Sequence, residues 1–425
     1  TTATGDGITA YAYDVVNRLT SIDYSDATPD VQFAYDGAGN RTSMVDGTGT
    51  QTYLYDALGR ATEIARGADV FSYSYDAAGN VTSRAYPGGS AATYAYDDDG
   101  RLGSVTKLGA TTSYAYDPAG HLTQAQLPAV NGYVETRAYD RAGRMSSIAH
   151  AKAGVPLASA SYVYDAVGSP TSMTTLAGIS TYAYDALDRL VDVCFAASCP
   201  GAADPFVRYA YDSVGNRTTE TRPAGVTTSS YDPGDRLVST SGPGGTTAYS
   251  FDANGNQTAA GARTFTYDLA GRMSSTTSGG ATTSYAYDGD GVRLSASEGL
   301  FSRSFLWDLN FGLPQLALER VGGLTTRSYL HWAGPVSVES GGSSSYLHRD
   351  LLGSVTDVTS ATGAALWSYA YEPFGAIRST NDSFGANRLR FAGEYLDRSG
   401  LYHLRAPSTT RPRAASPPPT RSRRP

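Results

Sequence analysis

Pairs of aromatic residues separated by one small residue recur along most of the chain, and an aspartate follows each pair. Tyr73-Ser74-Tyr75-Asp76 is one example. Residues i and i+2 of an extended strand point to the same face, so both rings cover one side of the strand. Strands favour aromatic residues on such half-buried surfaces. The pattern therefore predicts β-strands that each bury one aromatic face.

A turn signal follows each aromatic pair. It has the form Asp-x-x-Gly-Asn or Asp-x-x-Gly-Arg, as in residues 36–40 and 56–60. Asp starts a turn by accepting a hydrogen bond from the backbone two residues on, and Gly takes the positive φ of a tight hairpin. A second run, rich in Thr, Val and Leu, and a polar gap follow. Each unit is predicted to be strand, short turn, strand and loop.

The unit repeats with a period of roughly twenty residues, which is the signature of a repeat architecture. One hairpin is marginally stable alone, whereas stacked hairpins bury a continuous aromatic face. We therefore predict a single elongated or closed all-β body. The repeated aspartates are Asp14, Asp36, Asp56, Asp76, Asp97, Asp117, Asp140, Asp165, Asp185, Asp212, Asp232, Asp252, Asp268, Asp288 and Asp308.

These units resemble the YD repeats of the Rhs family, which also occur in insecticidal toxin complexes, bacterial wall-associated proteins and animal teneurins. The resemblance covers about residues 8–405. In that family the hairpins wind into a spiral β-sheet around a hollow interior. The resemblance therefore implies an all-β, cocoon-like shell with little helix; the period alone would also fit a flat solenoid.

The sequence pattern changes after Asp308, and from there the chain resembles the Rhs repeat-associated core. The elements of that core occur here in the family's order, at residues 346–354, 359–363, 367–375, 390–395 and 397–402. The resemblance implies a repeat region over residues 1–340 and a core over residues 341–405.

Residues 406–425 depart from the family's pattern and are rich in Pro and Arg. Read one base earlier, codons for this stretch can encode Leu-Tyr-Asp-Pro-Ala-Thr-Gly-Arg-Phe, which is how the family continues. We interpret the segment as a frameshift, and the alternative is a natural disordered tail. The nucleotide sequence across these codons distinguishes the two.

Composition adds few constraints. The chain has 47 Gly and 32 Tyr among 425 residues, only 17% charged residues, and no convincing helical period. A net charge of −7 does not favour nucleic acid or an anionic membrane as partner. No apolar run reaches the about eighteen residues of a transmembrane helix. The chain begins with Thr1 and shows no signal peptide, so we interpret it as a fragment of a longer exported product.

Two cysteines, Cys194 and Cys199, lie in the longest gap between repeated aspartates, Asp185 to Asp212. A small disulfide in a surface loop and two free thiols are both open interpretations. A metal site is disfavoured, because two ligands are too few and no histidine lies nearby in the sequence.

Two acidic stretches, residues 97–100 and 288–291, resemble the start of a calcium loop. Both lack the glutamate that such a loop needs at its twelfth position, and Asp-Gly is an ordinary turn sequence. We therefore expect turns at both places and predict no metal or cofactor site.

The five histidines show no metal-ligand spacing. They are His121, His150, His331, His348 and His403. His348 and Asp350 are two residues apart and could be mistaken for an acid–base pair, but the resemblance places them in the structural core. No nucleophile elbow and no phosphate loop occur in the sequence. We predict no catalytic residue.

The tyrosines allow three interpretations. They can form a cross-strand ladder that holds the hairpins together, an inner wall suited to an unfolded passenger, or platforms that stack on sugars. Their repeated placement favours the ladder for any single tyrosine, and the family favours a passenger over a sugar.

The resemblance implies a non-enzymatic shell of a bacterial Rhs-type polymorphic toxin. Its partners would be a C-terminal toxin passenger, absent here, and a delivery apparatus, and its location would be secreted or at the cell surface. Many relatives carry an aspartyl self-cleavage site beyond the core, and this chain has no aspartate after Asp397 to provide one. The alternatives are a surface protein that binds carbohydrate or another cell, and a decayed remnant without function.

Overall fold

The protein is a single curved antiparallel β-sheet with little other regular structure. The computed structural model describes residues 2–4, 7–332, 334–383 and 385–404, so the tail at 406–425 lies outside the described residues. The sheet has 37 strands, and each strand pairs with the next one along the chain. The described residues contain no α-helix, only a 3₁₀ turn, η1, at Phe391–Gly393. The predicted all-β class is confirmed.

Strands β1 to β29 form the outer ring of the molecule. They are β1 (Thr2–Thr4), β2 (Gly7–Tyr13), β3 (Leu19–Tyr24), β4 (Val31–Tyr35), β5 (Arg41–Asp46), β6 (Gly49–Tyr55), β7 (Ala61–Arg66), β8 (Asp69–Tyr75), β9 (Val81–Ala85), β10 (Ala91–Tyr96), β11 (Leu102–Lys107), β12 (Ala110–Tyr116), β13 (Leu122–Gln126), β14 (Tyr133–Tyr139), β15 (Met145–Lys152), β16 (Val155–Tyr164), β17 (Pro170–Thr175), β18 (Gly178–Tyr184), β19 (Leu190–Cys194), β20 (Phe206–Tyr211), β21 (Arg217–Arg222), β22 (Gly225–Tyr231), β23 (Leu237–Gly242), β24 (Gly245–Phe251), β25 (Gln257–Ala260), β26 (Arg263–Tyr267), β27 (Met273–Ser278), β28 (Ala281–Tyr287) and β29 (Arg293–Glu298).

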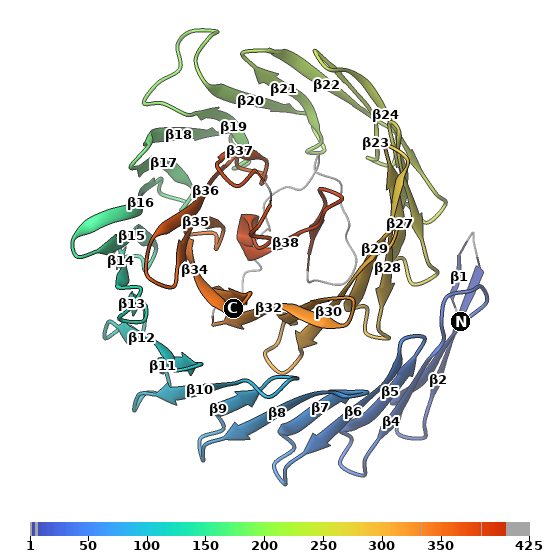
Figure 1. Ribbon diagram of the computed structural model, residues 1–425. Coiled ribbons are helices and arrows are strands. Elements are labelled where there is room, and N and C mark those ends of the chain that lie inside the picture. The colour runs from blue at the N-terminus through green and yellow to red at the C-terminus, as the bar shows by residue number, and fades with distance from the viewer. Residues whose placement is uncertain (1, 5–6, 333, 384, 405–425) are drawn as a thin grey trace.

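The remaining strands lie inside that ring (Figure 1). They are β30 (Phe301–Asp308), β31 (Gln315–Val321), β32 (Leu324–His331), β33 (Pro335–Ser340), β34 (Ser343–Arg349), β35 (Val355–Ser360), β36 (Ala365–Tyr371), β37 (Ile377–Thr380) and the small pair β38 (Tyr395–Leu396) and β39 (Tyr402–His403). We call β2–β29 the wall and β30–β37 the inner turn.

The repeated sequence builds a bulged hairpin at each turn. In the hairpin of β4 and β5, the amide of Gly39 donates to the carbonyl of Asp36, and the amide of Asp36 donates to the carbonyl of Asn40. The strand register shifts by one residue at Tyr35, and Gly39 has a φ of 94°. This is a type I turn followed by a left-handed glycine, which closes a hairpin with a bulge. The turn predicted from Asp-x-x-Gly is confirmed.

Three of these turns carry Asn or Asp where the others carry Gly, which predicts a stabilising substitution. Asp188 has a φ of 59° and is exposed. Because a residue with a Cβ strains in this region, Asp188→Gly should raise the free energy of unfolding by about 0.5–1 kcal/mol, net of the added freedom of the unfolded chain. Urea unfolding measures the change. The reverse change, Gly79→Asp, where φ is 94°, should lower the stability, and a loss of stability in Asp188→Gly would contradict the explanation.

The wall makes one circuit and overlaps its own beginning. Figure 1 shows β27–β29 arriving beside β2–β5. The amide of Leu269 donates to the hydroxyl of Thr28 at 2.9 Å, and the amide of Gly289 donates to the carboxylate of Asp46 at 2.8 Å. The sheet therefore spirals, and β30 enters the space inside the first strands.

The inner turn packs on the inward face of the wall and follows it in the same order. Apolar side chains of β6–β11 pack against those of β31–β33, whereas Tyr133 packs against Tyr346 and Tyr209 against Phe374 further along. The sheet runs across residue 340 without a break, because β33 pairs with β34. The division into regions 1–340 and 341–405 stays a prediction.

The last described residues also lie inside the wall. Arg293 of β29 forms a buried ion pair with Asp397, with 2.5 Å between the guanidinium nitrogen Nη1 and the carboxylate oxygen Oδ2. Arg263 of β26 donates to the carbonyl of Ser399 at 2.9 Å. The path of the chain therefore runs from the outer ring into the interior, as Figure 1 shows for β38.

Candidate functional site

The inward face of the wall is the candidate site, since the aromatic pairs gather there. The rings of Tyr53, Tyr73 and Tyr94 are 7%, 5% and 5% exposed, whereas Leu54, the residue between the two rings of one pair, is 56% exposed. This is the alternation of a strand with one buried face. The paired aromatic side chains therefore point toward the interior, and the residue between them points outward.

The second tyrosine of most pairs ties its hairpin to the preceding one. The hydroxyl of Tyr55 donates to the carbonyl of Arg41, the first residue of β5, at 2.9 Å. The same bond recurs around the wall, and Trp307 makes it through its indole N–H to Arg293. A buried hydroxyl needs such a partner, so these tyrosines form the predicted ladder. The others are Tyr35, Tyr75, Tyr96, Tyr116, Tyr139, Tyr164, Tyr184, Tyr211, Tyr231, Tyr287 and, in the inner turn, Tyr371.

Arginine occupies the end of every second turn and connects successive hairpins. Arg60 donates to the carboxylate of Asp56 in its own turn at 2.6 Å and to the carbonyl of Asp76 in the next turn at 3.1 Å. Its guanidinium lies 4.6 Å from the ring of Tyr75. This side chain lies over the next turn, which ends in the shorter Asn80. The equivalent arginines are Arg18, Arg101, Arg144, Arg189 and Arg272.

The turn aspartates are structural acceptors. The carboxylate of Asp36 accepts the amides of Ala38 and Asn40, and hydrogen bonds from Asn40 hold its pKa below the usual value. The closed turn therefore favours the ionised carboxylate.

A buried ion pair joins the wall to the inner turn. Arg84 of β9 and Asp308 at the end of β30 are 2.5 Å apart, with side chains 1% and 0% exposed. The hydroxyl of Tyr73 donates to the same carboxylate at 2.7 Å. The guanidinium carbon of Arg84 also lies 4.7 Å from the ring of Tyr86 and 5.0 Å from that of Phe311. These contacts fix where β30 sits on the wall.

Lys107 makes a second polar contact between the same layers. Its ammonium donates to the hydroxyl of Ser328 at 2.5 Å and lies 3.6 Å from the carboxylate of Glu339. Burial lowers the pKa of Lys107 to about 8, although Glu339 opposes the shift.

The structure brings together two histidines that are far apart in the sequence. Nδ1 of His150 in β15 and Nδ1 of His348 in β34 are 3.2 Å apart, and the two side chains are 2% and 1% exposed. Sequence analysis missed this pair, since no short spacing connects residues 198 positions apart. The other three lie elsewhere: His121 pairs with Asp117 in a turn, His331 contacts the carbonyl of Leu316, and His403 lies against Trp307.

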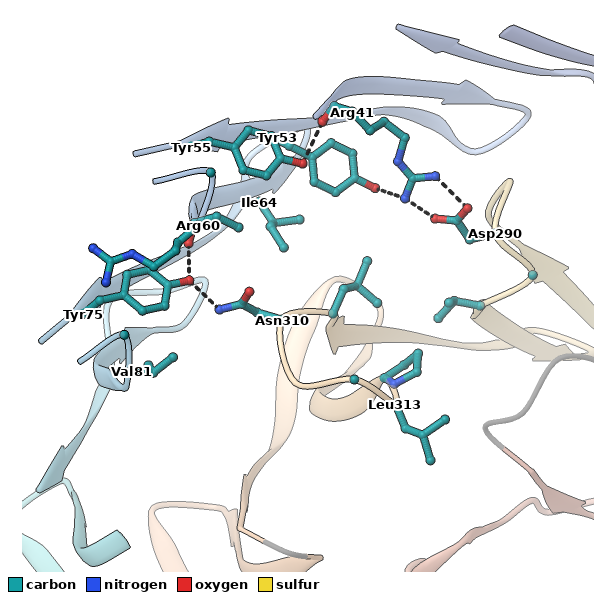
Figure 2. Close-up of a pocket in the computed structure, with 18 residues that line it drawn as sticks. Arg41, Tyr53, Tyr55, Arg60, Ile64, Tyr75, Val81, Asp290, Asn310 and Leu313 are labelled. Atoms are coloured by element: carbon teal, nitrogen blue, oxygen red, sulfur yellow. Dashed lines mark hydrogen bonds and ion pairs between the residues drawn. The ribbon is translucent and has the colours of Figure 1, made fainter. Parts of the chain in front are cut away.

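A pocket of about 760 Å³ opens where the wall meets the inner turn (Figure 2). At one end Arg41 contacts the carboxylate of Asp290 and donates to the hydroxyl of Tyr53 at 2.8 Å. At the other end the amide of Asn310 donates to the hydroxyl of Tyr75 at 2.9 Å. The size suits a small molecule or a peptide side chain. Its charged groups already have partners within the chain.

The two calcium-like stretches form turns, as expected. In the first, Arg101 pairs with the carboxylates of Asp97 and Asp99. In the second, Asp290 pairs with Arg41, while burial raises the pKa of Asp288 to about 6. Within the described parts of the chain, no group of three or more His, Cys, Asp or Glu side chains is placed to hold a metal ion.

The two cysteines form a disulfide with a Cα–Cα distance of 5.7 Å. Cys194 ends β19 and is buried, and Cys199 lies in the long loop before β20. Of the two open interpretations, the structure has the loop disulfide. None of the described segments forms a helix long and apolar enough to cross a lipid bilayer.

A single antiparallel sheet that spirals inward, with a Tyr-Asp turn stacked on the next at each hairpin, defines a YD-repeat shell. The chain belongs to the Teneurin YD-shell family, whose model matches residues 4–124 and 172–404. No curated protein matches the chain. The predicted membership of the YD-repeat family is confirmed.

Solved toxin-complex shells have the same fold. The chain is similar to the crystal structure of TcdB2-TccC3-TEV, with a TM-score of 0.69 and 17% identity over 93% of this chain and 24% of that one. It is also similar to TcdB2-TccC3, with a TM-score of 0.68 and 18% identity over 93% and 25% of the two chains. A Photorhabdus luminescens Tc holotoxin pore with a TccC3 mutation gives a TM-score of 0.58 at 18% identity, over 93% and 26%. The chain thus spans about a quarter of the length of these relatives.

Proposed function

We propose that this chain is part of the wall of a shell that encloses a polypeptide passenger. The passenger would be the C-terminal toxin domain of a bacterial Rhs-type polymorphic toxin, and the shell itself would have no catalytic role. The assembly would be exported or displayed at the cell surface, where a delivery apparatus passes the toxin to a competing cell.

One observation carries the proposal: the described chain starts in the outer ring and ends inside it. Asp397 and Ser399 are held on the inward face of β26–β29 by Arg293 and Arg263. A domain joined after residue 404 would begin its course in the interior. The aromatic inward face and the fold shared with toxin-complex shells support the same interpretation.

The test compares the accessibility of the two ends of the chain. A protease recognition sequence followed by a reporter domain is inserted after Leu404 in the full-length gene product, and the same insert is placed before Gly7 in a control. We expect the C-terminal insert to be cut at least about tenfold more slowly while the shell is folded, because burial of the backbone prevents cleavage. Denaturation should abolish the difference. Equal cleavage of both inserts in the folded protein would overturn the proposal.

A further inference from the structure

We propose that His150 and His348 form an acid-sensitive contact that holds the inner turn on the wall at neutral pH and weakens when both rings bind protons. This contact lies entirely within the described chain and does not depend on a passenger.

The geometry fixes which nitrogen of each neutral ring carries hydrogen. Nε2 of His150 lies 3.0 Å from the carbonyl oxygen of Arg349, which can only accept, so Nε2 is the donor. Nδ1 of His150 is then an acceptor, and Nδ1 of His348, 3.2 Å away, must donate to it. Nε2 of His348 in turn accepts from the hydroxyl of Thr359 at 2.9 Å. Every ring nitrogen is satisfied with both histidines neutral.

A buried amide completes the arrangement. Nδ2 of Asn131 donates to the hydroxyl oxygen of Thr359 at 3.1 Å and to the carbonyl of Ser360 at 2.8 Å. The hydroxyl hydrogen of Thr359 therefore remains directed at His348. The chain of donors runs from the loop before β14 through β35 and β34 to β15, so it spans the wall and the inner turn.

One proton can be accommodated at this site. Oε2 of Glu135 lies 3.7 Å from Nδ1 of His150 and can stabilise a single imidazolium there. His348 would then accept at Nδ1 and donate from Nε2 to Thr359. Glu135 cannot stabilise a second imidazolium, because its other oxygen already accepts a hydrogen bond from Arg137 at 2.6 Å.

A second proton has no place. Two imidazolium rings would direct N–H groups at each other across the 3.2 Å between their Nδ1 atoms, with no acceptor between them. Arg137 and the half-buried Arg349 add further positive charge beside the pair. Burial lowers the pKa of both rings, and the positive charge of a protonated His150 lowers the pKa of His348 further. Separation of β34 from β15 is what would relieve the conflict.

The direction of the pH dependence follows from the lowered pKa of the two histidines. The unfolded histidines both bind protons below their ordinary pKa near 6.5, while the folded pair holds at most one, so the contact is fully stable above that pH and weakens as the pH falls. Two carboxyls oppose the trend: burial raises the pKa of Asp350 and of Asp357 to about 6, and Asp357 faces His348 across the β34–β35 ladder. They bind protons in the folded state and stabilise it on acidification. The histidine effect must therefore be measured as a difference between variants.

The matched control is built into the repeat. His121→Asn removes a partly exposed histidine at a turn position where Asn40 and Asn80 already stand, with the same bond to the turn aspartate. The test variants are His348→Asn, whose amide can still donate toward His150, and His150→Asn as a second route if the first fails to fold. Asp350 and Asp357 are unchanged in all of them.

Two measurements decide the matter. Nitrogen-15 spectra of the histidines at about pH 7.5 should show hydrogen on Nδ1 of His348 and on Nε2 of His150. Hydrogen exchange of β15 and β34 should then show an opening equilibrium that rises with acid by up to about tenfold per pH unit, because the opened pair binds two protons and the closed pair accommodates one. His348→Asn should lose most of that dependence, and His121→Asn should keep it.

Either of two results would overturn the inference. One is hydrogen on Nε2 of His348 at about pH 7.5, since the donor chain would then be wrong. The other is an exchange profile of β15 and β34 whose pH dependence, after correction for intrinsic exchange, is the same in the unsubstituted protein, His348→Asn and His150→Asn.

Discussion

Asp308→Asn should lower the free energy of unfolding by about 3–5 kcal/mol, because it leaves the buried Arg84 charge without a counter-charge. The two side chains are 1% and 0% exposed, so water cannot replace the lost carboxylate. Asparagine keeps the size of the side chain and can still accept a hydrogen bond from the hydroxyl of Tyr73. In the unsubstituted protein this hydroxyl lies 2.7 Å from the carboxylate of Asp308. The loss of stability therefore measures the effect of removing the charge and not the effect of a cavity.

Urea unfolding measures the change, and two further variants identify its cause. Asp192→Asn breaks an ion pair with Arg208 whose side chains are 37% and 43% exposed, so it should cost no more than about 1 kcal/mol. The double variant Arg84→Met with Asp308→Leu removes both charges and should recover much of the loss. If Asp308→Asn costs no more than Asp192→Asn, the ion pair does not hold the inner turn on the wall.

Asp308 also shows where sequence reasoning stops. It occupies the same place in the repeat as the turn aspartates, and the repeat predicted its strand correctly. At Asp36 the partners come from the next four residues, so a local pattern can find them. The partners of Asp308 lie 224 and 235 residues away, and only the spiral brings them together. Its different role could not be predicted.

The fold itself was predictable because its determinants are local and repeated. The Tyr-Asp pair, the left-handed Gly39 and the arginine of every second turn each act within one hairpin or between neighbours. The overlap of the spiral depends instead on contacts such as Gly289 to Asp46, which no periodicity signals. The pair of His150 and His348 could not be predicted for the same reason, because each histidine alone occupies an ordinary position in a strand.

Glu319→Gln is expected to release the segment that follows the inner turn. The carboxylate is fully buried; Arg303 pairs with it, and Arg327 donates to it at 2.9 Å. The hydroxyl of Tyr395 donates to its other oxygen at 3.2 Å. Because glutamine leaves two largely buried guanidinium groups without their counter-charge, the change should cost about 3–5 kcal/mol. Burial and the neighbouring arginines already lower the pKa of Arg388 close by, so the site tolerates little added positive charge.

Limited proteolysis of residues 385–404 and urea unfolding measure this effect together. Tyr395→Phe is the matched control: it removes one hydrogen bond to the carboxylate but no charge, and should cost about 1.5–3 kcal/mol at most. A Glu319→Gln protein as resistant to protease as Tyr395→Phe would show that the charge does not hold this segment.

The two substitutions together also test how the layers cooperate. Asp308 joins the inner turn to the wall, whereas Glu319 joins the inner turn to the segment around Tyr395. Stacked repeats contact mainly their neighbours, so each layer can open without the one outside it. Glu319→Gln should then expose residues 385–404 to protease while hydrogen exchange in β8 and β9 stays slow. Asp308→Asn should speed exchange in β8, β9 and β30 alike. If both variants loosen all of these segments equally, the wall and its contents unfold as one unit.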